Sequence, residues 1–258
     1  MIRSLICSFG LLAVAVAHAG ECTLASAQHR TAVLELYTSE GCSSCPPADR
    51  WLASLRSGGV AADQAVLLAF HVDYWNRLGW PDRFAKPGFS ERQRAVAARA
   101  SRGIVYTPQV LLDGVDYRRR GDPAALRELL RSVNARPPGA TITGRIERVR
   151  DAVHVGGAIR ASEQGPARAF VALFENGLWS QVRSGENAGR RLEHDFVVRE
   201  LAGPIALDTR GVAELDLRIA VPEDADAQRL GLAVYVERTA DGDVLQATSI
   251  YPLTHCGG

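Results

Sequence analysis

Two cysteines separated by two residues are the part of this sequence best suited to chemistry. Cys42 and Cys45 stand in the segment GCSSCP, where a strand-like apolar run gives way to a helix-like run. Thiolate is the reactive form of cysteine, and a helix N-terminus stabilises it through unpaired amides and the helix dipole. We therefore predict that Cys42 is the attacking thiol, exposed enough to form a mixed disulfide, and that Cys45 resolves that intermediate.

The same cysteine spacing also occurs in metal sites. His71 and Asp73 end the second predicted strand, on the same sheet edge as the cysteines if the strands are parallel. Together with Cys42 and Cys45, His71 could complete a copper or zinc site. Structural hydrogen bonding is the more common role of such residues, so we expect no metal and no other cofactor and keep the metal site as the weaker alternative.

Glu35 and Pro108 support a redox interpretation. Glu35 is an acid inside an apolar strand, where a charge is costly, so we expect a raised pKa or a partner. It could accept the proton of Cys45, or it could be a solvent-facing glutamate or part of a structural ion pair. Pro108 follows Thr107 at a strand entry, where a cis peptide bond would present backbone groups to a substrate strand opposite Cys42. An ordinary trans proline is the alternative.

Two further segments have open interpretations. Aromatic residues follow the second strand and could line a groove for a partner polypeptide, or could fold a long connection onto its domain; they are Tyr74, Trp75, Trp80, Phe84 and Phe89. Residues 185–190 are turn-like and lead into a strand that contains His194 and Asp195. They could face the cysteines across a domain boundary, or they could be an ordinary hairpin loop.

The N-terminus has the features of an export signal. Arg3 precedes an apolar stretch over residues 5–17, and residues 17–19 have the small-x-small form that signal peptidase cuts. We predict a signal peptide over residues 1–19, cleaved after Ala19, and a periplasmic or secreted bacterial protein. The apolar stretch is shorter than the ~20 residues of a spanning helix, so no membrane span is expected after cleavage.

Cleavage would remove Cys7 and leave four cysteines, which allow three pairings. Cys42 and Cys45 are close enough in sequence to pair with each other. Cys22 and Cys256 then remain, one near each end of the mature chain, and we predict that they form a structural disulfide.

The elements that must position these residues alternate at first between strand and helix. We predict strands over 32–37, 65–73, 109–114 and 116–120, and helices over 42–55, 90–101 and 123–133. Ser90 and Asp122 are the expected N-caps of the second and third helices. This order of elements is that of the thioredoxin fold.

A Pro-rich linker at 136–139 precedes a part of the chain without helical periodicity. Seven strand-like runs follow it, over 141–148, 152–159, 167–174, 192–198, 213–220, 230–238 and 244–251. We predict an α/β thioredoxin-like domain over residues 20–136, followed by an all-β sandwich-like domain over residues 137–258. Lysines and arginines number 30 and acidic residues 29. The resulting net charge of +1 is too small to favour nucleic acid as a partner.

Four blocks of sequence resemble a family of secreted bacterial thioredoxin-like proteins known as domain of unknown function 1223. The blocks are LELYTSEGCSSCPPAD (34–49), FHVDYW (70–75), VYTPQ (105–109) and GENAGR (185–190). The resemblance implies a fold and an exported location, and it implies little about function because the role of the family is not established. The chain departs from thioredoxins at Ser43 and Ser44, which replace their usual dipeptides, and at Glu35, which replaces their buried aspartate one residue further from the first cysteine.

Our leading functional prediction is an exported thiol–disulfide oxidoreductase that acts on protein thiols or disulfides of exported proteins. Cys42 and Cys45 would be its catalytic pair, supported by Glu35, Thr107 and Pro108. The alternatives are a periplasmic copper chaperone and a non-catalytic envelope assembly module with an inert disulfide.

Overall fold

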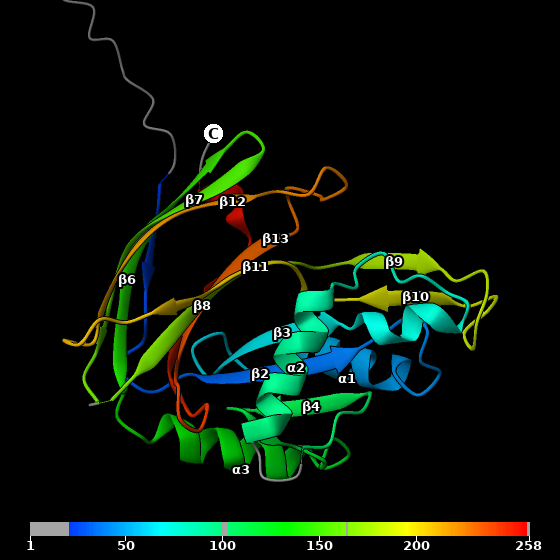
Figure 1. The fold of residues 1–258 in the computed structure, drawn as a ribbon, viewed down its shortest axis with the longest axis horizontal. Coiled ribbons are helices and arrows are strands. Elements are labelled where there is room, and N and C mark those ends of the chain that lie inside the picture. Colours follow the sequence, from blue (N-terminus) through cyan, green and yellow to red (C-terminus); the bar gives the residue numbers. More distant parts are fainter. Residues whose placement is uncertain (1–20, 100–102, 164, 257–258) are drawn as a thin grey trace, which may run out of the picture.

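The computed structural model describes residues 21–99, 103–163 and 165–256, and it contains two large sheets (Figure 1). The predicted signal peptide, residues 1–19, lies outside the described residues. The strands are β1 (Cys22–Ala25), β2 (Ala32–Thr38), β3 (Ala65–His71), β4 (Gln109–Leu112), β5 (Val115–Asp116), β6 (Ala140–Val149), β7 (Ala152–Ala161), β8 (Ala167–Glu175), β9 (Leu178–Gln181), β10 (Arg191–His194), β11 (Val197–Ala206), β12 (Val212–Ala220), β13 (Leu230–Arg238) and β14 (Val244–Ile250). The helices are α1 (Pro46–Ser57), α2 (Pro87–Arg99), α3 (Pro123–Asn134) and the short 3-10 helices η1 (Asp73–Leu78) and η2 (Leu253–His255).

One sheet crosses the predicted domain boundary. Its eight strands have the order β14-β13-β8-β11-β3-β2-β4-β5, while β1, β6, β7 and β12 form a four-stranded sheet. The link between the two halves is the parallel pairing of β11 with β3, where Val197 lies opposite Ala69 and the Ala69 amide donates to the Phe196 carbonyl at 2.7 Å. Strands make up 42% of the protein and helices 19%. The predicted fold, an α/β thioredoxin-like domain followed by an all-β sandwich-like domain, is therefore wrong.

The physical reason is that a strand pattern specifies which residues are buried, but not which sheet edge the strand will join. Residues 192–198 were expected to form one strand. Phe196 instead has a left-handed backbone, with φ of 58°, and divides them between β10 and β11. β10 pairs with β9, while β11 passes into the large sheet.

Helix boundaries follow local capping chemistry. Asp122 caps α3 as predicted, because its carboxylate accepts from the Ala125 amide at 2.9 Å. Helix α2 begins at Pro87, three residues before the expected cap Ser90. Ser90 is buried inside that helix, where its hydroxyl accepts from the Asp73 amide at 3.1 Å.

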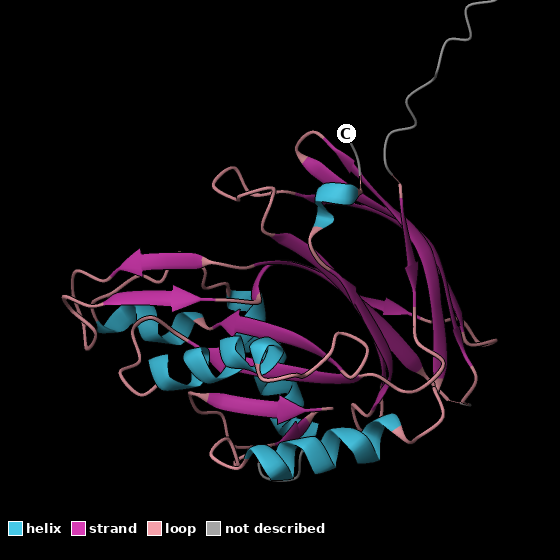
Figure 2. Ribbon diagram, turned by 180° about the vertical axis from the view of Figure 1, so that it is seen from behind, coloured by secondary structure: helices cyan, strands magenta, loops and turns pink. Residues whose placement is uncertain are grey.

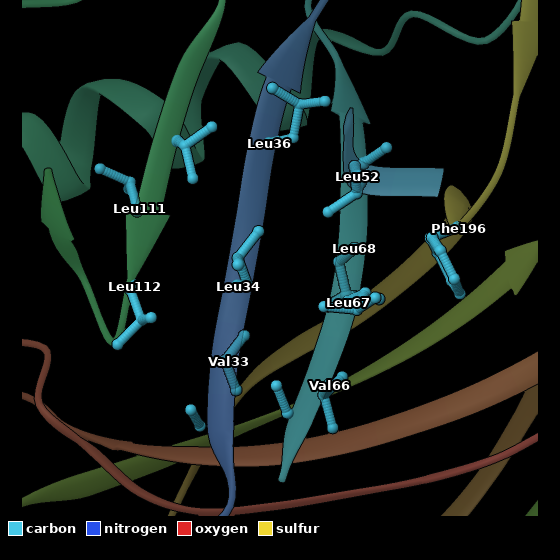
Figure 3. Packing of buried hydrophobic residues seen from close by; sticks show 14 of the residues in the cluster. Val33, Leu34, Leu36, Leu52, Val66, Leu67, Leu68, Leu111, Leu112 and Phe196 are labelled. Carbon is cyan, nitrogen blue, oxygen red and sulfur yellow. The ribbon is translucent and has the colours of Figure 1, made fainter. Parts of the chain in front are cut away.

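The eight-stranded sheet is covered on both faces. In β8, Val171 and Leu173 pack toward the four-stranded sheet, while Phe170 and Phe174 belong to the core that includes the helices. Every residue of β2 is buried, as the apolar run predicts. Figure 3 shows leucines of β2, β3 and β4 with Leu52 of α1 in the same core. Seen from behind, α1, α2 and α3 lie away from the four-stranded sheet, while the short helix η2 lies beside it (Figure 2).

Both predicted cysteine pairings are confirmed. Cys22 in β1 is joined to Cys256, with their Cα atoms 4.8 Å apart, and this bond spans 234 positions of sequence. Cys42 is joined to Cys45, with a Cα separation of 5.4 Å. None of the described helices combines the length and the apolar character needed to cross a membrane.

A buried arginine on α2 connects the two parts of the large sheet. The Arg92 guanidinium pairs with Glu35 of β2 at 2.7 Å and with Glu237 of β13 at 3.2 Å. It also lies over the ring of Phe170, 4.5 Å from the centroid. Arg99 and Arg168 pair with the same Glu237 carboxylate, so strands β2, β8 and β13 are held together by one charge network.

Replacing this cation should destabilise the fold strongly. An Arg92→Met variant leaves Glu35 and Glu237 buried without it, and we expect a loss of about 3–5 kcal/mol in the free energy of unfolding, measured by urea titration. Burial raises the pKa of Glu35 above 4.5 despite the attraction of Arg92. Without Arg92, ionisation of the buried Glu35 costs more, so the loss of stability in Arg92→Met should grow as pH rises above 4.5. Arg94→Met, at an exposed position of the same helix, is the control and should change stability little. Equal losses in the two variants would contradict a central role for Arg92.

Candidate functional site

The Cys42–Cys45 disulfide lies in the turn that leads from β2 into α1. The Cys42 amide donates to the Ser39 carbonyl at 3.2 Å, and the Cys45 amide donates to the Cys42 carbonyl at 3.1 Å. Cys45 is the N-cap of α1, and prolines fill the first helical positions, where their missing amides cost nothing. The sequence expectation placed Cys42 at the helix start, whereas the structure places it one turn earlier.

Neither cysteine is exposed. The accessible fraction is 0% for both Cys42 and Cys45, although Ser43 and Ser44 between them are exposed. The expectation of an exposed attacking thiol is therefore not met while the pair is oxidised. Thiol–disulfide exchange at Cys42 requires the surrounding chain to move.

Trp75 connects the cysteine turn to the segment that contains Pro108. A Cβ atom at position 41 would lie 3.3 Å from Trp75 Cβ, so Gly41 permits this close approach. The Trp75 indole donates to the Thr107 hydroxyl at 2.7 Å. The Thr107–Pro108 peptide bond is cis. Trp75 thus contacts both Thr107 and the cysteine turn.

Glu35 points away from the cysteine side of the sheet. Side chains alternate along a strand, so Glu35 and Tyr37 share one face of β2, and this face meets α2 through the Glu35–Arg92 ion pair. The structural ion pair, one of the roles considered for Glu35, is therefore present, and it is buried. The expected rise of its pKa is present, caused by burial and opposed by Arg92.

A buried polar cluster occupies the other face, beside the cysteine turn. His71 at the end of β3 is fully buried, and its Nδ1 lies 2.6 Å from Asp82 Oδ2. Asp82 also accepts from the amides of Glu40 and Phe84, each at 2.9 Å. Asp82 therefore ties the end of β3 to the residues just before Cys42.

His194 of β10 completes the cluster. Its ring packs edge-on against His71 with centroids 4.9 Å apart, and its Nε2 lies 3.3 Å from Glu40 Oε1. Its Nδ1 lies 3.9 Å from Asp49 Oδ2, in the first turn of α1. We name these five buried residues the polar cluster: Glu40, Asp49, His71, Asp82 and His194.

Burial and pairing shift the cluster's proton affinities in different directions. Burial raises the pKa of Asp49, and the attraction of His194 and His71 only partly opposes it. Burial alone would lower the pKa of His71, but the adjacent Asp82 carboxylate raises it above 6.5. Asp82 shows the reverse. Burial alone would raise its pKa, but the attraction and hydrogen bond of His71, together with the hydrogen bonds from the Glu40 and Phe84 amides, lower it. The cluster can therefore hold both an ion pair and a carboxyl that keeps its proton more readily than usual.

The metal alternative gains no support from this geometry. Among the described residues, no group of three or more histidine, cysteine or acidic side chains is arranged to hold a metal ion. His71 uses Nδ1 for Asp82, and the two cysteines are bonded to each other.

The aromatic connection after β3 packs against both parts of the chain, since Phe84 shares a small core with Leu178 of β9 and Val197 of β11. The Trp80 indole donates to Glu40 at 2.7 Å, and the Tyr74 hydroxyl donates to Gln93 at 3.1 Å. Residues 185–190 fit both of their interpretations, because they belong to the hairpin loop between β9 and β10 and also face the cysteine turn.

Sequence reasoning did not identify Glu40, Asp49 or Asp82 as site residues. Asp49 carried a usable signal, because it follows Cys45 by four positions and so shares its face of a helix. Asp82 carried none, since it stands in an irregular connection and reaches the site only through tertiary packing.

Comparisons with known proteins place the chain in a family without giving it a function. The family described as "Protein of unknown function (DUF1223)" matches residues 33–237. A crystal structure of a protein from Agrobacterium tumefaciens is similar, with 28% identity, a TM-score of 0.61 and coverage of 87% of this chain and 96% of that one. HBP35 of Porphyromonas gingivalis shares the fold at 13% identity, with a TM-score of 0.66 and coverage of 87% and 76%. No curated protein matches the sequence.

The His71–Asp82 pair should give stability that declines with rising pH. A folded-state pKa above 6.5 means that the native state binds the extra proton more tightly, so this stability is full below 6.5 and is lost as pH rises through the raised pKa. In wild-type protein, the free energy of unfolding should therefore fall as pH rises above 6.5. A His71→Asn variant should lack this fall, while His154→Asn, which alters an exposed histidine, should retain it. An unchanged pH profile in His71→Asn would exclude the pair as its source.

Proposed function

This chain belongs to the DUF1223 family, and we propose that it is an exported thiol–disulfide oxidoreductase that exchanges electrons with protein dithiols. The observation that carries the proposal is the disulfide at the N-cap of α1, directly beside a buried cluster of proton-binding side chains. A pair that only stabilises the fold has no need of titratable groups behind it. Perturbed proton affinities next to a nucleophile are typical of functional sites.

The exchange takes two steps. A substrate thiolate attacks Cys42 Sγ, the Cys42–Cys45 bond breaks, and its electron pair passes to Cys45, which takes up a proton. A second substrate thiolate then attacks the mixed disulfide and releases Cys42 as a thiolate. The substrate loses two electrons and two thiol protons and becomes a disulfide, while the pair becomes reduced. The reverse sequence reduces a substrate disulfide.

Asp49 takes the proton role first assigned to Glu35. It lies one helical turn beyond Cys45, and its amide donates to the Cys45 carbonyl at 3.1 Å. Because side chains at positions i and i+4 share a helix face, the Asp49 carboxyl lies on the Cys45 side of α1. Burial raises its pKa, so it can supply a proton when Cys45 leaves and recover it when Cys45 attacks.

Export is part of the proposal. Two disulfides are typical of oxidising compartments outside the cytosol. The N-terminal sequence pattern supports the same location.

The decisive test uses the two cysteines separately. Cys42→Ser should abolish oxidation of a reduced model protein dithiol, because the attacked sulfur is gone. Cys45→Ser, mixed with a model protein disulfide, should accumulate mixed disulfides, because the Cys42 thiolate attacks the substrate disulfide and no second cysteine resolves the product; these adducts are detected on non-reducing gels and by mass spectrometry. A Cys22→Ser/Cys256→Ser variant is the control and should retain exchange, since that pair lies in the other sheet's region.

The rival function is an envelope assembly module with an inert disulfide, which the 0% exposure of both cysteines favours. It predicts that neither single variant alters dithiol oxidation, and that the potential of the pair lies below about −300 mV. These results together would overturn the oxidoreductase proposal.

Asp49 should affect exchange without supporting the fold. An Asp49→Asn variant should resolve mixed disulfides at least about tenfold more slowly and should lose the part of the wild-type pH profile that reports this acid. Its stability should not fall at neutral pH, because a carboxyl with a raised pKa loses stability as pH rises above 3.8 and an amide has no such loss. Stopped-flow measurement of resolution and urea titration check the two outcomes. A slow variant with an unaltered pH profile would assign Asp49 a structural role instead.

A further inference from the structure

A loop from the distant half of the chain closes over the cysteine turn. This covering loop, residues 182–190, joins β9 to β10. The Asn187 side chain is fully buried, and its amide donates to the Glu40 carbonyl at 2.8 Å and to the Cys42 carbonyl at 3.0 Å. The Asn187 side chain therefore fixes the backbone at Cys42.

Glu186 makes a second contact on the same turn. Its carboxylate accepts from the Ser43 amide at 2.9 Å. Hydrogen bonding by the Ser43 side chain and by the Ser43 amide lowers the pKa of Glu186, so Glu186 carries a negative charge beside the cysteine pair at neutral pH. The Ser184 hydroxyl donates to the Gly79 carbonyl on the other side of the turn.

The loop can move as one piece. Its own hydrogen bonds close it at the base, where Val182 and Arg190 pair at 2.9 Å, and Arg190 also donates to the Asn187 side chain at 2.7 Å. Apart from Val182 and Asn187, its residues are exposed. Lifting the loop from the cysteine turn breaks the hydrogen bonds of Ser184, Glu186 and Asn187 described above and the packing of Gly185 against Trp80.

The charge of Glu186 makes closure depend on the redox state of the pair. In the oxidised protein both sulfurs are neutral, and the carboxylate is free to accept from Ser43. Reduction by a dithiol breaks the sulfur–sulfur bond, adds two electrons and leaves Cys42 as a thiolate while Cys45 takes a proton. The exposed Glu186 carboxylate and the Cys42 thiolate then lie against the same short turn and repel each other.

We propose that the covering loop is a redox-operated gate, closed over the disulfide and opened by reduction so that Cys42 can meet a polypeptide disulfide. The gate rests on the proposed function in one respect, that the Cys42–Cys45 bond is reducible. It explains how Cys42, which has no exposed surface in the oxidised protein, becomes accessible once the pair is reduced.

Limited proteolysis measures the gate directly. Arg183 and Arg190 are exposed, so trypsin releases the peptide 184–190 when the loop lifts. Its release, followed by mass spectrometry, should be about tenfold faster in protein reduced with dithiothreitol than in oxidised protein, because cleavage follows the open population. A Cys42→Ala/Cys45→Ala variant in the same reductant controls for reduction of Cys22–Cys256 and should stay closed.

Two loop variants separate the charge from the hydrogen bonds. Glu186→Gln keeps an acceptor for Ser43 but carries no charge, so its loop should be cut after reduction at nearly the oxidised rate. Glu193→Gln, an exposed charge change on β10, should behave as wild type. Asn187→Ala should release the peptide quickly even when oxidised. If Asn187→Ala does not fold, the result for Glu186→Gln decides whether the gate exists.

The gate is overturned if wild-type protein, with both thiols of the pair verified by alkylation, releases the peptide no faster than oxidised protein. It is also overturned if Glu186→Gln opens on reduction as fully as wild type. Failure of the proposed function has a different signature, which is loss of dithiol exchange in a protein whose loop still opens on reduction.

Discussion

Arg92 carries its charge into the interior, between the two parts of the eight-stranded sheet. Its guanidinium lies 4.5 Å from the centroid of Phe170 and 5.2 Å from that of Tyr235, and pairs with Glu35 and Glu237. A buried charge is tolerated only where its partners surround it, so α2, β2 and β13 are fixed in one relative position. The continuous sheet depends on this constraint, because β11 and β3 pair at a single position.

The same constraint decides which side of β2 is available for chemistry. Glu35 is the acid that precedes the cysteines in sequence, but it is held on the α2 side by Arg92. The opposite side receives His71 from β3, Asp49 from α1 and His194 from β10. A sheet separates its faces strictly, since neighbouring side chains point in opposite directions. The fold therefore gives Glu35 a structural role and leaves Asp49 beside Cys45.

The site is also completed from outside its own segment. Asn187 is 145 positions from Cys42, yet its amide binds the Cys42 carbonyl. His194, from the same hairpin, contributes to the polar cluster. The hairpin of β9 and β10 therefore links the C-terminal strands to the cysteine turn. The cysteine pair lies at a junction of the two parts of the chain rather than within one of them. Its accessibility is a property of that junction.

The sequence by itself determined the features that depend on near neighbours. The strand-to-helix transition at Cys42 and Cys45, the cap at Asp122, the buried run of β2 and the pairing of Cys22 with Cys256 all follow from spacing, capping preference or a small number of choices. Tertiary structure decided the rest: the edge that β11 joins, the partner of Glu35, and the meeting of Asp82 and Asn187 with the cysteine turn. Periodicity shows which side chains leave water, but the partner of a sheet edge or of a buried charge is chosen by packing between segments far apart in the chain, where local preference carries no information.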